Sequence, residues 1–143
     1  MRGISRISFA VVLCVAVSAA AFAAGDAPLT MTPAQRKWAP AAIPGVMTAV
    51  AWGDPAKGAH GAFHKFDAGW AAPLHTHSAS TKIVVLSGTM AMVGEDGKEM
   101  KFPAGSFYTQ PNTYRHITKC LAGAPCMVYL EADGAWDMKP VAK

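Results

Sequence analysis

Short apolar stretches alternate with turn-forming residues from position 46 to the end of the chain, at a spacing of about eight to twelve residues. No long segment repeats its apolar residues with a helical period, so the pattern predicts β-strands. The predicted strands cover 47–52, 59–66, 74–77, 82–87, 89–93, 99–102, 106–110, 116–120 and 127–131. Many short strands separated by turns indicate an all-β barrel or sandwich of antiparallel strands.

The front of the chain has a different pattern. Arg2 and Arg6 precede an apolar stretch that ends in Ala21-Phe22-Ala23, the layout of a secretory signal peptide. Its apolar core is too short for a comfortable membrane span, although an uncleaved anchor is the alternative. We expect a cleaved signal peptide over 1–23 and a periplasmic or secreted protein. Residues 24–45, rich in Ala and Pro, are expected to form an extended arm before a domain at 46–143, with Thr32 and Pro33 starting one short helical turn.

Composition narrows the function classes. The 143 residues are 52% hydrophobic and 15% charged, which fits one folded domain and argues against a disordered chain. Loss of two arginines with the signal lowers the formal net charge from +4 to +2, and the remaining basic residues are scattered. We therefore expect a small-molecule partner, no nucleic acid, and no membrane span after signal cleavage.

Two of the three cysteines, Cys120 and Cys126, remain after cleavage. An even pair in an exported chain indicates a disulfide, here closing a hairpin loop between two strands. The alternative is a reduced Cys120 that acts as a reactive thiol or a soft metal ligand, four residues after His116.

His75 and His77 lie one residue apart, so on a strand both imidazoles point to the same face. That arrangement lets two ring nitrogens bind one metal ion. Alone the pair is weak evidence, because two exposed or hydrogen-bonded histidines give the same spacing.

Three of the five histidines, His75, His77 and His116, lie within two longer motifs. The motifs run Gly69-x5-His75-x-His77-x3-Thr81-x6-Gly88 and Gly105-x5-Pro111-x-Thr113-x2-His116-x3-Cys120. These resemble the two signature motifs of the cupin family, G-x5-H-x-H-x3/4-E-x6-G and G-x5-P-x-G-x2-H-x3-N. Trp52-Gly53-Asp54-Pro55 and the segment 133–137 are similar to single-domain, often exported cupins.

The resemblance implies a small antiparallel jelly-roll barrel with one metal ion near its mouth, held by His75, His77 and His116. It implies a divalent transition metal, with Zn, Fe, Ni, Mn and Cu all open. Thr81 stands where the motif has Glu, and a count one residue longer puts Lys82 there, which cannot ligate while protonated. Without a carboxylate ligand, a bound ion would keep its +2 charge, because the three imidazoles are neutral. The alternative is a pocket that binds no metal.

Outside the three motif histidines, the candidates for binding a substrate are Tyr108, Gln110, Thr81 and His64. Tyr108 and Gln110 share one face of the predicted strand, where they can orient a substrate or a water molecule. The alternative for Tyr108 is packing in the core. His60, beside a Gly/Ala turn, is expected to be exposed, and Phe107 is expected in the core.

Two functions remain open at this point. The first is a metal-dependent enzyme of the oxygenase or isomerase type, since some cupin oxygenases resemble this chain in using three histidines and no carboxylate. The second is a non-enzymatic barrel that binds a small ligand or a metal, with a homodimer as its expected assembly. No general base is identifiable within either motif, so no catalytic residue is assigned.

Overall fold

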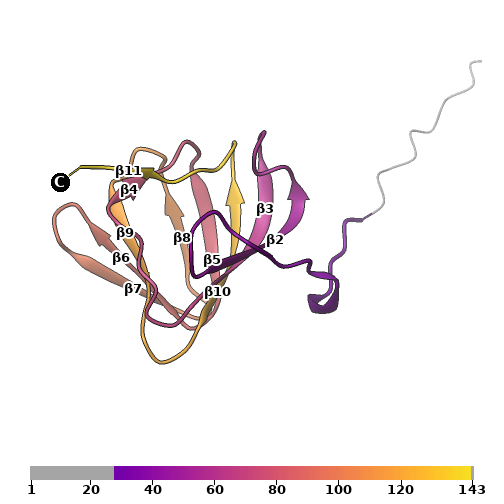
Figure 1. Cartoon of the computed structure of the whole chain (residues 1–143), viewed down its shortest axis with the longest axis horizontal. Helices are drawn as coiled ribbons and strands as arrows, with labels where there is room; N and C mark the ends of the chain where they lie inside the picture. Colours follow the sequence, from indigo (N-terminus) through magenta and orange to yellow (C-terminus); the bar gives the residue numbers. More distant parts are fainter. Residues whose placement is uncertain (1–27, 143) are drawn as a thin grey trace, which may run out of the picture.

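The computed structural model describes residues 28–142, which form two antiparallel sheets (Figure 1). The predicted signal peptide, 1–23, lies outside the described residues. The first sheet has the order β1-β2-β3-β10-β5-β8, with strands β1 (Ala39–Pro40), β2 (Val46–Gly53), β3 (His60–Phe66), β10 (Cys126–Ala132), β5 (Thr81–Ser87) and β8 (Phe107–Gln110). The second has the order β11-β4-β9-β6-β7, with strands β11 (Lys139–Pro140), β4 (His75–Thr76), β9 (His116–Cys120), β6 (Thr89–Gly94) and β7 (Glu99–Pro103).

All nine predicted strands are present, and each begins and ends within one residue of its predicted bounds. The prediction of an all-β, antiparallel jelly-roll barrel is confirmed. The sequence pattern did not predict β1 and β11, because strands of two residues are too short to show alternation.

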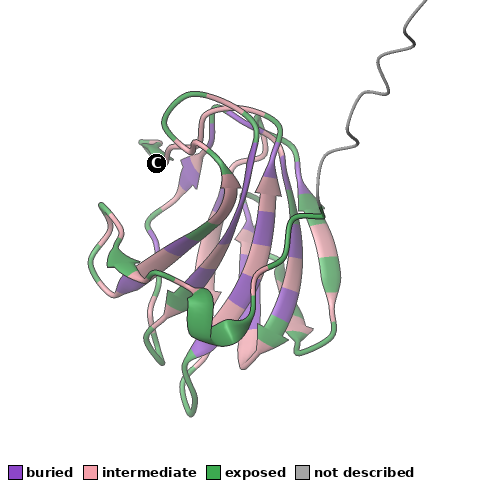
Figure 2. Cartoon of the chain, turned by 90° about the vertical axis from the view of Figure 1, so that its right-hand side faces the viewer, coloured by how far each residue is buried: buried purple, intermediate pink, exposed green. Residues whose placement is uncertain are grey.

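The core lies between the two sheets and follows the period of two along each strand. Burial alternates residue by residue in β10 and is visible as purple bands across the strands in Figure 2. Ile83, Val85, Val128 and Leu130 from the first sheet pack in one cluster with Met90 from the second. Phe107 does not join them. It is 62% exposed, so its prediction as a core residue is wrong, because it points away from the barrel on the edge strand β8.

The end of the arm is attached to the first sheet. A short 3-10 helix, η1 (Pro33–Gln35), starts at Thr32 as predicted, and the Thr32 backbone N–H donates to the Gln35 side chain at 2.7 Å. The Arg36 guanidinium then lies 3.9 Å from the ring centre of Phe63 in β3, and β1 pairs with β2. No helix within residues 28–142 is long and apolar enough to cross a membrane.

The predicted disulfide joins Cys120, at the end of β9, to Cys126, at the start of β10. Both cysteines are buried. Cys120 therefore carries no free thiol, and the alternative role as a soft metal ligand is wrong. The prediction that this bond closes a hairpin is wrong, because β9 and β10 belong to different sheets and do not pair. The bond closes the loop by which the chain crosses from one sheet to the other, at the end of β9 opposite His116.

Candidate metal centre

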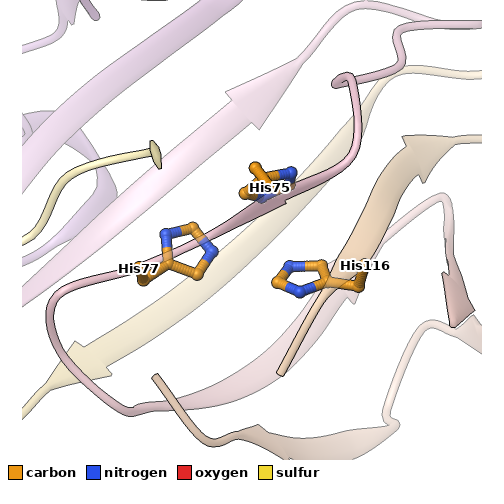
Figure 3. Close-up of side chains that lie close together, drawn as sticks. All are labelled: His75, His77 and His116. Carbon is orange, nitrogen blue, oxygen red and sulfur yellow. The ribbon is translucent and has the colours of Figure 1, made fainter. Parts of the chain in front are cut away.

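The three motif histidines come together between β4 and β9. These strands pair with His75 directly opposite His116, and His77 follows at the end of β4. Their rings point toward one another in Figure 3, and one nitrogen atom of each ring lies within 4.8 Å of the others. All three side chains are buried, at 2%, 7% and 0% exposure in chain order. The structure thus brings together every histidine that the motifs select.

Backbone carbonyls fix how each of these rings is oriented. The Nδ1 atoms of His75, His77 and His116 are bonded, in turn, to the carbonyl oxygens of Pro73 (2.7 Å), Asp137 (2.6 Å) and Tyr114 (2.8 Å). A carbonyl oxygen only accepts, so Nδ1 must carry the hydrogen. In a neutral imidazole this leaves the Nε2 lone pair free, which is the arrangement that binds a metal.

Burial keeps these imidazoles neutral. Desolvation lowers the pKa of all three, and for His116 it lowers the pKa to about 4 despite the bond to the Tyr114 carbonyl. Neutral imidazole is the form that ligates. Three buried, neutral imidazoles with one ring nitrogen each within 4.8 Å of the others fit a divalent transition metal such as Zn, Fe, Ni or Cu.

Thr81, at the position of the motif Glu, does not reach the histidines directly. It is 2% exposed, and its hydroxyl donates to Oε1 of Gln110 at 3.2 Å. The Gln110 amide nitrogen lies 3.1 Å from Nε2 of His116 and 3.2 Å from the sulfur of Met92. Lys82, the alternative occupant of the motif position, is exposed on the other face of β5. Gln110 therefore lies within hydrogen-bond distance of the cluster, at Nε2 of His116.

A cavity of about 50 Å³ adjoins the histidines, with room for a few water molecules. Besides His75 and His77, its lining includes three of the four candidate substrate residues, Tyr108, Gln110 and His64. The Tyr108 ring stacks on Phe102 with ring centres 4.2 Å apart, and burial raises the pKa of its hydroxyl. Tyr108 is thus both a packed aromatic residue and part of the cavity wall, with a neutral hydroxyl.

His64 lines the same cavity from β3 and is 5% exposed. Its Nδ1 lies 3.0 Å from the hydroxyl of Thr48, and its Nε2 is buried without a hydrogen-bond partner. The prediction that His60 is exposed is wrong. Residue 60 is 1% exposed, because it shares the inward face of β3 with His64 and its Nδ1 donates to the Gly58 carbonyl at 3.0 Å.

The sequence analysis did not select Trp136, whose ring packs over His77 and His64 and lines the cavity. Its ring stacks on His77 with centres 5.2 Å apart and lies 5.7 Å from the ring of His64. The segment is held in place by Asp137, whose carboxylate accepts hydrogen bonds from the backbone N–H and the hydroxyl of Ser78, both at 2.7 Å. The sequence signal for this segment was only its similarity to exported cupins.

The buried His64 predicts a pH dependence of stability. Burial, with a smaller contribution from His60, lowers its pKa from 6.5 to about 4. The unfolded chain therefore binds a proton that the folded chain does not as the pH falls from about 6.5 toward 4, and stability is lost over that window. We expect His64→Asn to reduce this loss in metal-free protein by about 2 kcal/mol at pH 5 relative to pH 8. Urea unfolding of wild type and His64→Asn at both pH values measures this difference in stability. The same change in unfolding free energy in both proteins would contradict the prediction.

Comparisons with solved structures agree on the fold. The polyketide cyclase RemF from Streptomyces resistomycificus superposes with a TM-score of 0.68 at 18% identity, over 80% of this chain and 85% of the cyclase. An RmlC-like cupin protein from Ralstonia eutropha gives 0.65 at 18% identity, over 80% and 76% of the two chains. The DMSP lyase DddQ from Ruegeria pomeroyi gives 0.57 at 17% identity, over 77% and 68%. At these identities the likeness establishes the fold alone.

A search of curated proteins finds no match. The model of a family described as a domain of unknown function, DUF4437, matches residues 31–143, which include both histidine motifs and the covering tryptophan. Several of the similar solved structures are named cupins, so the fold of this chain is the cupin fold. The family match covers most of the chain, which therefore belongs to the DUF4437 family.

Proposed function

We propose that this protein binds one divalent transition metal through His75, His77 and His116 and acts as a metal-dependent enzyme on a small organic anion. The observation that carries the proposal is the set of three buried Nε2 atoms, each freed for ligation by a backbone carbonyl at Nδ1. When bound, such an ion polarises an oxygen atom of the substrate as a Lewis acid. Among the structural relatives, a polyketide cyclase and a DMSP lyase carry the names of enzymes.

The charge of the site favours an anionic ligand. Three neutral imidazoles leave the ion's +2 charge uncompensated, and none of the described residues that line the adjoining cavity is Asp or Glu. A carboxylate or an enolate oxygen supplies the missing negative charge in this low-dielectric environment.

The space for the substrate extends past Trp136. The cavity at the histidines holds only about 50 Å³, but a second cavity of about 500 Å³ shares part of its lining, including His64, Trp136, Ile43 and Met138. The walls common to both are mostly apolar. We propose that an apolar body occupies the larger cavity, while its anionic group passes Trp136 to reach the histidines.

Within this arrangement the chain's own residues orient the substrate and handle its protons. His64 is neutral at pH 7, because burial lowers its pKa to about 4, and its Nε2 has no hydrogen-bond partner. We propose that His64 is the group that hydrogen-bonds the substrate beside the metal, with Trp136 excluding bulk water. The Tyr108 hydroxyl, neutral as well, is a second donor on the cavity wall.

The test is metal content followed by turnover. Untagged protein supplemented with Zn, Fe, Ni, Mn or Cu is expected to hold about one equivalent of metal, and the His75→Ala/His77→Ala variant less than about 0.2 equivalents by elemental analysis. Metal-loaded protein is then assayed with small carboxylates and enolisable diketones, with oxygen uptake recorded. Less than about 0.2 equivalents in both proteins would refute the metal site.

A second candidate is a non-enzymatic barrel that stores a small ligand or senses metal. The observation in its favour is that the described lining of the cavity contains no carboxylate to act as a general base. Stoichiometric metal with no turnover and no oxygen uptake across the panel would support this candidate over the enzyme.

We also propose that the protein acts outside the cytoplasm. The charged, apolar and small-residue segments of 1–23 support export, and so does the buried Cys120–Cys126 disulfide, which is stable in an oxidising compartment. Expression in a bacterial host with the full leader, followed by mass measurement of periplasmic protein, tests this. A product starting at residue 24 is the expected result, and full-length protein retained in the cytoplasm would contradict it.

A further inference from the structure

On the basis of the function proposed above, we infer that Gln110 is the fourth protein group of the metal site, and that its side-chain amide oxygen takes the place of a carboxylate ligand. Motif comparison draws attention to Thr81, where a cupin motif has Glu. The structure places a different residue, on a different strand, against the histidines.

The pairing of β8 with β5 places Gln110 beside the histidine cluster. Gln110 is the last residue of β8, and in the β5–β8 pair it lies directly opposite Thr81. Its side chain is 5% exposed and lines the cavity that also contacts His75 and His77. The amide nitrogen is 3.1 Å from Nε2 of His116. Because that Nε2 lone pair points into the cluster, the amide occupies space next to the ion that the cluster would hold.

A half-turn of the amide group is enough to present oxygen instead of nitrogen. The two ends of a glutamine amide have nearly the same shape, and they differ in that the nitrogen donates while the oxygen accepts or ligates. In the present arrangement the NH₂ group faces His116 and the sulfur of Met92, and Oε1 accepts from Thr81. After the half-turn, the oxygen faces the histidines and the NH₂ group faces Thr81.

Thr81 suits both orientations of the amide. A hydroxyl donates to Oε1 in one orientation and accepts from Nε2 in the other. It is 2% exposed, so an apolar residue in its place would leave one end of the buried amide without a partner. Thr81 is therefore a positioning residue, which holds Gln110 against the cluster without contacting the ion.

This assignment predicts a distinct order of metal affinities. A neutral amide oxygen is a weaker donor to a +2 ion than a carboxylate, so Gln110→Glu should bind metal more tightly than wild type. Gln110→Met keeps the volume but offers no oxygen, and it should bind more weakly. Thr81→Val removes the hydroxyl at similar size and should weaken binding through Gln110 alone.

The experiment is a titration of metal-free, untagged protein with Co(II) against a chelator, combined with the visible absorption of the bound ion, which responds to its ligands. We expect an affinity about tenfold lower with changed absorption bands for Gln110→Met and for Gln110→Ala, and about tenfold higher for Gln110→Glu. Thr81→Val/Gln110→Met should bind no more weakly than Gln110→Met, since both changes act through one group. Thr109→Val, an exposed neighbour on β8, is the matched control and should match wild type.

Unchanged affinity and unchanged absorption bands in a folded Gln110→Met protein would overturn the assignment. If wild type binds no Co(II) at all, the proposed function fails, and the Glu variant decides the role of Gln110. If Gln110→Glu then binds one equivalent of Co(II), position 110 is placed among the ligands. If Gln110→Glu also binds no Co(II), the assignment of Gln110 as a ligand is overturned.

Discussion

Replacement of His116 by alanine is expected to abolish the stabilisation that a bound metal gives to the folded protein. A metal present at 100 times its dissociation constant stabilises wild type by about 2.7 kcal/mol, because it binds the folded chain and not the unfolded one. Loss of one of the three histidine ligands should weaken binding by more than about 100-fold, since changes outside the ligand set alone cost 10–100-fold. The same metal concentration then adds about 0.4 kcal/mol or less. Urea unfolding with metal and with chelator measures both values.

His60→Ala is the matched control for this experiment. His60 is 1% exposed, and its Nδ1 bonds the carbonyl of Gly58, two residues earlier, as His116 bonds the carbonyl of Tyr114. Both variants therefore remove a buried imidazole with the same backbone hydrogen bond, and both should destabilise the metal-free protein. Only His116→Ala should lose the response to metal. An undiminished metal response in His116→Ala would place the ion elsewhere.

The fold was predictable because each strand carries its own local signals. Turns such as Glu95-Asp96-Gly97 mark the ends of strands, and the alternation within β5 and β10 marks their faces. The wrong predictions concern the burial of side chains, which depends on the tertiary structure and not on the local sequence. A Gly/Ala-rich turn gives no sign that His60 points into the barrel, and an aromatic side chain such as Phe107 is apolar enough for a core although it lies on the outer face of an edge strand.

The site was predictable to the extent that motif spacing follows strand geometry. His75 and His77 share a face by the period of two, and the second motif adds His116. The neighbours of these residues could not be inferred in the same way. Gln110 meets Thr81 only because β8 pairs with β5, 29 positions away along the chain. Trp136 reaches His77 only because Asp137 binds the backbone and hydroxyl of Ser78, a contact between residues 59 positions apart.

Gly88→Ala is expected to destabilise the protein by about 2–5 kcal/mol. Gly88 links β5 to β6, where the chain passes from one sheet to the other, and its φ of +72° is strained for any residue with a Cβ. A Cβ there would also lie 2.8 Å from the Pro125 carbonyl oxygen and 2.9 Å from both Cα and Sγ of Cys126. Backbone and a disulfide sulfur cannot move aside easily, so overpacking of about 1–3 kcal/mol adds to conformational strain of about 1–2 kcal/mol.

Gly105→Ala separates these two contributions. Gly105 opens the second motif with a φ of +88°, but a Cβ there would meet no atom within 4 Å. Its substitution should cost only the strain, about 1–2 kcal/mol. Urea unfolding of both variants at one pH gives the comparison. Equal losses would show that the glycine of the first motif is required for its dihedral angle alone, whereas a larger loss for Gly88→Ala would show that the crossing between the sheets needs the close approach to the disulfide-closed loop between Cys120 and Cys126.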